Sequence, residues 1–229
     1  MEKQTLKILA QFNTWKYKRA HPSKIQEMGK IIEDCAMKNI PIPLVGYWSI
    51  GNKSLPDKNE YAALSYLDEL RNNVRKIYGP GIKITFIISD LHAKNNLIPD
   101  EKIKSYTEEI EKILANSGFS TIRLSELYKK YNLSIKKINC CGKIWWLFFP
   151  LKNILVKQAA RVSLREDKNL CARQYALMRI AESKILEKEY KDYIFITYSS
   201  PLFKSLHPRL PTLYLYSIKK GCSEAPWFK

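Results

Sequence analysis

Apolar, β-rich runs alternate with amphipathic segments through the first half of the chain. The run 82–89 (IKITFIIS) is apolar at most positions, which is typical of a strand buried on both faces in a parallel sheet. Residues 44–48 (LVGYW) and 119–124 predict two further strands. Between these runs, Leu and Ile recur every three or four residues, as in helices. The alternation predicts an α/β fold with a doubly wound, mostly parallel sheet flanked by helices.

The rest of the chain continues this pattern. A helix that begins near Glu60 is stopped by 78–81 (YGPG), and the spacing predicts other helices over about 23–38 and 169–188. Residues 193–198 and 212–217 predict the last two strands. A length of 229 residues fits one α/β domain. We therefore expect a single domain over 1–229, in which 1–38 forms an N-terminal helical extension.

Polar residues follow two of the predicted strands directly. Ligands of doubly wound sheets bind beyond the carboxyl ends of the strands, which here points to 46–51 and 90–96. Asp90 is a candidate to bind an amino group, and His92 or Asn95 to hydrogen-bond a ribose or a carbonyl. The alternative is that Asp90 or Asn95 caps the next helix.

The chain carries a large positive charge. Lys and Arg total 39 against 22 Asp and Glu, a formal net charge of +17. Such an excess favours a polyanionic partner, although Lys-rich usage in AT-rich coding sequence is a second explanation. Much of this positive charge lies in the region 123–173, where few acidic residues are interspersed. We expect this region to face transfer RNA rather than to be an ordinary solvated helix face. The candidate phosphate contacts are Lys152, Lys157, Arg161, Arg165 and Arg173.

Other classes of protein are not expected. The longest apolar run, 144–151, is shorter than the roughly 20 residues that span a bilayer. The N-terminus lacks the apolar core of a signal peptide, so we expect a cytoplasmic protein without membrane contact. The five cysteines show no metal-ligand spacing, which predicts neither a metal nor a disulfide. Oligomeric state is not readable.

One motif resembles a known family. Residues 88–93 (ISDLHA) resemble the strand-end motif of tyrosyl- and tryptophanyl-tRNA synthetases, whose catalytic domain is Rossmann-like. The chain lacks that family's His-x-Gly-His and Lys-x-Ser-Lys-Ser motifs, so ATP-dependent activation is not expected. The tRNA-dependent cyclodipeptide synthases are similar to that domain, need no cofactor and take two aminoacyl-tRNAs. Within them, 48–96 looks most like the arginine-using branch.

This resemblance implies specific roles. That family uses a Ser after the first strand as acyl acceptor, and a Tyr and a Glu on a late helix to hold the amino group and move protons. A raised pKa would suit the Glu to proton transfer. The corresponding catalytic residues are Ser49, Tyr175, Glu182 and Tyr198, and the substrate-binding residues include Gly46 and Trp48. The alternatives are a plain loop serine at Ser49, a core role for Tyr175, and Glu187 or Glu189 in place of Glu182.

A second resemblance competes. Residues 55–60 (LPDKNE), 78–84 (YGPGIKI), Ser89-Asp90 and 225–227 (APW) are similar to the isonitrile and dityrosine-precursor synthases. Those enzymes convert the nitrogen of an amino acid to an isonitrile with a sugar phosphate. The chain departs from that family at Leu91, where the family has Gly, and at 197–199 (TYS), where it has Ile-His-Pro.

Three functions follow from the sequence. The first is an aminoacyltransferase, a cyclodipeptide synthase that makes a diketopiperazine from two aminoacyl-tRNAs. The second is an isonitrile synthase acting on a free amino acid and a sugar phosphate. The third is a non-catalytic RNA-binding domain that stacks bases on aromatic side chains. Those side chains, which a core would also explain, are Trp145, Trp146, Phe148 and Phe149.

Overall fold

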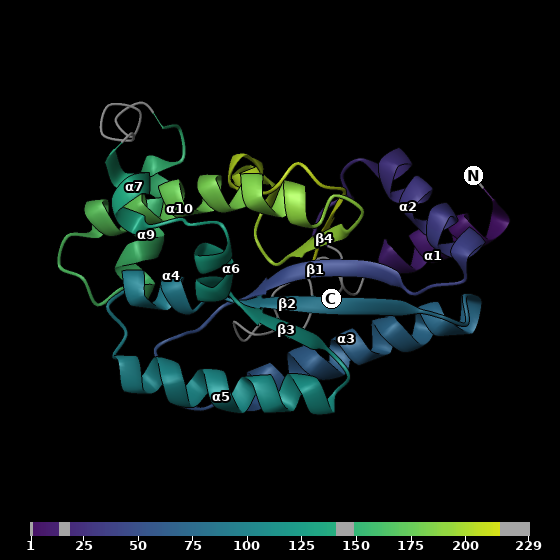
Figure 1. Cartoon of the computed structure of the whole chain (residues 1–229), viewed down its shortest axis with the longest axis horizontal. Coiled ribbons are helices and arrows are strands. Elements are labelled where there is room, and N and C mark those ends of the chain that lie inside the picture. Colours follow the sequence, from purple (N-terminus) through teal and green to yellow (C-terminus); the bar gives the residue numbers. More distant parts are fainter. Residues whose placement is uncertain (1, 14–18, 141–148, 216–229) are drawn as a thin grey trace.

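The computed structural model describes residues 2–13, 19–140 and 149–215 (Figure 1). Their centre is a five-stranded sheet in the order β3-β2-β1-β4-β5, and each neighbouring pair is parallel. The strands are β1 (Ile42–Trp48), β2 (Ile82–Ile88), β3 (Ser120–Arg123), β4 (Ile194–Thr197) and β5 (Thr212–Tyr214). The chain leaves β1 toward β2 on one side and returns to β4 on the other. The strand order therefore reverses beside β1, where doubly wound folds bind ligands.

Helices cover both faces of the sheet (Figure 1). On one face, side chains from four helices share a core with Leu44, Trp48 and Ile84. These helices are α1 (Lys3–Phe12), α2 (Ile25–Lys38), α3 (Lys58–Ile77) and α5 (Asp100–Asn116). On the opposite face, Val45 and Ile87 pack with two helices, α6 (Leu124–Lys130) and α10 (Lys168–Glu189). Neighbouring residues of β1 thus point to different cores, as the period of two in a strand requires.

Shorter elements complete the described part. The helix α4 (Asp90–Asn95) directly follows β2, and α7 (Ile135–Cys140) and α9 (Lys152–Val162) precede α10. A 3₁₀ helix, η1 (Pro201–Leu206), joins β4 to β5. In the third core, Phe149 and Leu155 pack with Ala172, Ala176 and Leu206 from α10 and η1.

The predicted strands and the helices over 23–38, 60–77 and 169–188 are confirmed. Asp57 caps α3 by accepting a hydrogen bond from the amide of Asn59, and the Glu60 carboxylate accepts one from the amide of Asp57. The helix ends before Gly81, whose φ of +69° favours glycine. The α/β, doubly wound, Rossmann-like fold is the one expected from the alternation of elements.

Some local predictions differ or lie outside the described residues. The helix α4 directly after β2 was not predicted, whereas α1, which begins at Lys3, lies in the helical segment predicted over 1–38. Trp145, Trp146, Phe148 and the end of the strand predicted over 212–217 fall outside the described ranges. Within those ranges, Cys35 and Cys171 are free thiols. There, no helix is long and apolar enough to cross a membrane, and no three metal-ligating side chains gather.

Candidate active site

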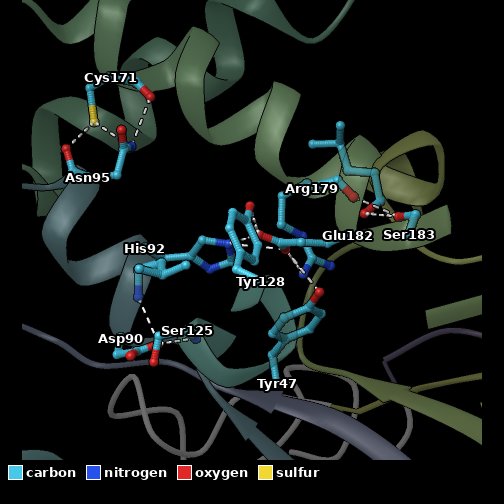
Figure 2. Close-up of polar contacts among 12 residues, drawn as sticks. Tyr47, Asp90, His92, Asn95, Ser125, Tyr128, Cys171, Arg179, Glu182 and Ser183 are labelled. Atoms are coloured by element: carbon cyan, nitrogen blue, oxygen red, sulfur yellow. Dashed lines mark hydrogen bonds and ion pairs between the residues drawn. The ribbon is translucent and has the colours of Figure 1, made fainter. Parts of the chain in front are cut away.

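Glu182 lies at the centre of a buried polar cluster on the α10 face of the sheet (Figure 2). Its side chain is 2% exposed. The hydroxyl of Tyr47 donates to Oε2 at 2.9 Å, and the hydroxyl of Tyr128 donates to Oε1 at 2.9 Å. The imidazole Nε2 of His92 lies 2.9 Å from Oε1, and Arg179 Nη1 lies 3.4 Å from Oε2. The carboxylate therefore has a hydrogen-bond partner on every side.

Four elements bring these side chains together. Tyr47 is the penultimate residue of β1, and His92 lies in α4, directly after β2. Tyr128 comes from α6, while α10 carries Arg179 and Glu182 three residues apart on one helical face. Because β1 and β2 are parallel, their carboxyl ends meet at one edge of the sheet. The cluster lies at this edge, where the strand-order rule places a ligand site.

Aromatic rings pack around the charged groups. The guanidinium carbon of Arg179 lies 3.9 Å from the centroid of the Tyr47 ring, a cation–π contact. The ring of Tyr175 meets that of His92 edge-on, with centroids 5.1 Å apart. Tyr175, predicted from sequence, thus contacts the cluster through His92.

The cluster keeps Glu182 ionised. Burial alone would raise the pKa of Glu182, but the charge of His92 in its protonated form, the charge of Arg179, and the hydrogen bonds from His92 and Tyr47 together lower it to about 2. The expectation of a raised pKa is therefore wrong, because it considered burial without the basic partners. Burial raises the pKa of Tyr47 well above its ordinary value, so this phenol stays protonated and keeps donating.

The ionised carboxylate fixes the tautomer of His92. An ionised carboxylate only accepts hydrogen bonds, so the Nε2 atom of His92 must carry the hydrogen that lies between them. In neutral His92 the other nitrogen, Nδ1, then has the free lone pair. A histidine oriented by a carboxylate in this way is the usual arrangement of a general base.

The short helix α4 is fixed at both ends (Figure 2). At its start, Asp90 Oδ1 accepts hydrogen bonds from the amides of Leu91 and Ser125, the latter in the first turn of α6. At its end, the side-chain nitrogen Nδ2 of Asn95 donates to the backbone oxygen of Cys171 in α10 at 3.2 Å. These hydrogen bonds hold Asp90 and Asn95, the two predicted substrate contacts, to the protein and place His92 between two anchors, while Asn95 Oδ1 has no partner among the described residues.

Other predicted residues lie away from Glu182. The Trp48 indole is 1% exposed and donates to the hydroxyl of Tyr106 in the core on the α3 face. Gly46 faces β4, where an added Cβ would lie 2.5 Å from Ile196 Cγ1. Tyr198, just beyond β4, packs against the α3-face core, and its hydroxyl has no hydrogen-bond partner among the described residues. Ser49 directly follows β1 and is exposed.

The alternatives to Glu182 are involved in surface contacts. Glu189 hydrogen-bonds to Lys130 and Tyr131, and Glu187 accepts a hydrogen bond from the amide of Arg209. The structure thus brings Glu182, rather than Glu187 or Glu189, to the other predicted residues His92 and Tyr175.

Sequence reasoning missed Tyr47, Tyr128 and Arg179. The alternation within 44–48 offered one signal, because it places Tyr47 on the opposite face from Trp48. Arg179 was a second, since it lies one turn from both Tyr175 and Glu182. For Tyr128 no signal was available, because its contact with Glu182 spans 54 positions of sequence.

The predicted phosphate contacts are only partly exposed. Lys157 and Arg161 are exposed on α9, whereas Lys152 and Arg173 are half-buried. Arg165 has a structural contact, because its Nε atom donates to the backbone oxygen of Asn95 at 2.6 Å. Lys157 and Arg161 are therefore the best placed of the predicted contacts to meet a partner.

Comparison with known proteins decides the family. The family model described as pyoverdine/dityrosine biosynthesis protein matches residues 51–199. The chain belongs to this family. The L-tyrosine isonitrile synthase of Xenorhabdus nematophila is 35% identical over 103 residues, which are 44% of this chain and 30% of that enzyme. The match thus spans less than a third of the relative's length.

Solved structures show the same fold. The PvcA protein from Pseudomonas aeruginosa superposes with a TM-score of 0.68 and 16% identity over 94% of this chain and 84% of that chain. Tyrosyl-tRNA synthetase from Archaeoglobus fulgidus, solved with L-tyrosine, superposes with a TM-score of 0.60 and 16% identity. The match covers 95% of this chain and 65% of that chain. These likenesses confirm the Rossmann-like fold and the resemblance to the synthetase catalytic domain.

Proposed function

We propose that this protein is an isonitrile synthase, which converts the amino nitrogen of a free amino acid to an isonitrile with carbon from a sugar phosphate. The observation that carries the proposal is the extent of the family match. Residues 51–199 include every member of the cluster around Glu182 except Tyr47. The relative from Xenorhabdus nematophila, named as an L-tyrosine isonitrile synthase, supports the same reaction class.

The cluster suits the first step of such a reaction. The amine nitrogen attacks the carbonyl carbon of the sugar, and loss of water from the adduct gives an imine. This step needs a base to remove a proton from the ammonium group and an acid to protonate the departing hydroxyl. His92 fits both roles in turn, because its Nδ1 lone pair accepts the proton and the imidazolium returns it.

Glu182 supports His92 without taking the proton. With a pKa held near 2, the carboxylate of Glu182 stays ionised at neutral pH and stabilises the imidazolium. The hydroxyls of Tyr47 and Tyr128 fix the carboxylate, and the edge of the Tyr175 ring fixes the imidazole. The preorganised cluster therefore favours the protonated state of the base at the moment it forms.

Product analysis of matched variants tests the proposal. Purified protein is incubated with L-tyrosine and a panel of pentose and hexose phosphates, and the products are followed by mass spectrometry. We expect an isonitrile from the intact protein, and its rate to fall about 100-fold or more in His92→Gln and Glu182→Gln. Glu189→Gln, a surface carboxylate of the same helix, is the control and should retain the rate. Equal rates in all variants would show that the cluster is not the active site.

A second candidate is the cyclodipeptide synthase, favoured by the position of Ser49. This residue directly follows β1, at the carboxyl edge of the sheet, and its side chain is exposed. A serine there has room to attack the ester of an aminoacyl-tRNA. In that case, incubation with aminoacyl-tRNA would give an aminoacyl adduct on Ser49 and a cyclic dipeptide, both lost in Ser49→Ala. Isonitrile formation, in contrast, should survive Ser49→Ala.

A further inference from the structure

The guanidinium of Arg179 is buried but makes few hydrogen bonds. The residue is 5% exposed, and arginine carries five N–H donors. Within the described part of the chain, one hydrogen bond is formed, from Nη1 to Glu182 Oε2 at 3.4 Å, which is long for a charged pair. Most of its donor capacity is therefore unused by the residues that the structure describes.

Glu182 compensates this charge only in part. Its carboxylate also accepts from Tyr47, Tyr128 and His92, all at shorter distances than from Arg179. A buried cation is costly unless an anion pairs with it closely. The stacking on Tyr47 offsets some of this cost but satisfies no N–H donor. The guanidinium of Arg179 therefore keeps N–H donors with which a second anion can pair.

A second buried group with an unused nitrogen, His207, directly follows Leu206, which is hydrogen-bonded to α10 one turn after Arg179. His207 is 6% exposed, and its Nδ1 atom has no hydrogen-bond partner among the described residues. The hydroxyl of Ser183 donates to the backbone oxygens of Arg179 and Leu206, which ties α10 to the residue before His207. Burial, and then the positive charge of Arg179, lower the pKa of His207 to about 3. The imidazole is therefore neutral and offers one N–H donor.

We propose that Arg179 and His207 form an oxyanion-binding subsite beside Glu182. Its ligand is a carboxylate or phosphate group, because the planar guanidinium pairs with two oxygens of such an anion at once. With its hydrogen on Nδ1, the atom without a partner among the described residues, the neutral imidazole donates to a further oxygen of the anion. Which substrate supplies the anion, the amino acid or the sugar phosphate, rests on the proposed function, whereas the binding of an oxyanion does not.

Binding measurements on the intact chain test the subsite. Isothermal titration compares L-tyrosine with tyramine, which lacks the carboxylate, and inorganic phosphate with chloride. We expect the wild type to prefer at least one oxyanion ligand over its control. Arg179→Gln should lower the affinity for that ligand about 10- to 100-fold. If Arg179→Gln loses the preference for L-tyrosine over tyramine, the subsite binds the carboxylate of the amino acid. If Arg179→Gln loses phosphate binding, the subsite binds the phosphate of the sugar phosphate. An unchanged preference in Arg179→Gln, or none in the wild type, overturns the proposal.

A second variant keeps the test valid if Arg179→Gln does not fold. Glu182→Gln retains Arg179 and removes the anion that competes for it, so oxyanion binding should tighten about tenfold. Glu189→Gln is the matched control and should bind as the wild type does. Weaker or equal oxyanion binding in Glu182→Gln contradicts the proposal. Oxyanion binding without any isonitrile product would contradict the proposed function alone, so the two failures are distinguishable.

Discussion

At the residue scale, the charge of Glu182 depends on its neighbours more than on its burial. Desolvation favours the neutral acid, but His92 and Arg179 favour the carboxylate and prevail. His207 shows the opposite case, since burial without an acidic partner keeps it neutral. Two buried groups of the same region are thus expected to titrate in different pH windows.

The first prediction concerns Glu182 and stability. Its pKa is 4.5 in the unfolded chain and about 2 in the folded one, so the stabilisation is complete above pH 4.5 and is lost as pH falls toward 2. We expect the free energy of unfolding of Glu182→Gln, measured with urea at a series of pH values, to fall less over this window than that of the wild type. Glu108→Gln, an exposed acid of α5, is the control. Parallel curves for Glu182→Gln and wild type would contradict the burial of an ionised carboxylate.

The second prediction concerns His207. Its pKa is 6.5 unfolded and about 3 folded, so the unfolded state binds the proton first as pH falls. The stability that depends on neutral His207 is therefore present above pH 6.5 and declines toward pH 3. In His207→Gln, this decline should be smaller between pH 6.5 and 4.5, where Glu182 contributes little. An unchanged slope in that range would mean that His207 takes up protons in the folded state.

The site residues were only partly predictable. Asp90, His92 and Asn95 stood out because they follow a buried strand, and Glu182 because a family resemblance pointed to it. No local pattern indicates that Asp90 is hydrogen-bonded to α6 and Asn95 to α10, because those contacts join residues 35 and 76 positions apart. Partners decide whether a polar residue binds substrate or anchors a helix, and partners come from the fold.

At the element scale, α4 depends on its anchors. A six-residue helix is too short to be stable in isolation, and α4 is tied to α6 by Asp90 and to α10 by Asn95. This shortness also explains why no helix was predicted there, since six residues show no helical periodicity. The strands, in contrast, carry long apolar runs and were predictable within a few residues.

The third prediction tests the anchor at the end of α4. Asn95→Ala removes the hydrogen bond to Cys171, so α4 should loosen and His92 should lose its fixed position beside Glu182. We expect a loss of stability of about 1–2 kcal/mol, faster amide hydrogen exchange in α4, and a lower turnover number. Asn153→Ala, an exposed asparagine of α9, is the control. Unchanged exchange in α4 would show that Asn95 is not needed to hold it.

The fourth prediction concerns the contact between β1 and β4. A Cβ at Gly46 would lie 2.8 Å from the backbone oxygen of Ile196, which cannot move without separating the strands. Gly46→Ala should therefore destabilise the protein by about 1–3 kcal/mol in denaturant titration. Gly79→Ala is the matched control, because nothing lies within 4 Å of its added Cβ. Equal stability of the two variants would contradict the tight packing of β1 against β4.

At the scale of the whole molecule, the order of the strands determines where the site forms. The sequence predicted parallel strands, but their order follows from how helices pass over each face, which no local pattern encodes. Because the order reverses beside β1, Tyr47 can meet α6 and α10 above the same edge. The net charge was readable from composition, whereas its distribution over the surface was not.

The fifth prediction concerns this charge. If the exposed side chains of Lys157 and Arg161 contact phosphates, their reversal to Glu should weaken tRNA binding and reduce the slope of affinity against salt by about 2. The control changes Lys112 and Lys191 to Glu, which alters the net charge by the same amount. These two lysines are also exposed but have acidic neighbours. Equal weakening in both double variants would indicate a general charge effect rather than a binding surface on α9.

We propose that the cluster around Glu182 builds an isonitrile on the nitrogen of a free amino acid. The most direct measurement combines ¹⁵N-labelled L-tyrosine with uniformly ¹³C-labelled sugar phosphates and follows the product by mass spectrometry and NMR. We expect a directly bonded ¹⁵N–¹³C pair in an isonitrile, formed by the wild type and not by His92→Gln. A product formed equally by both proteins, or a cyclic dipeptide formed from aminoacyl-tRNA with no isonitrile, would contradict it.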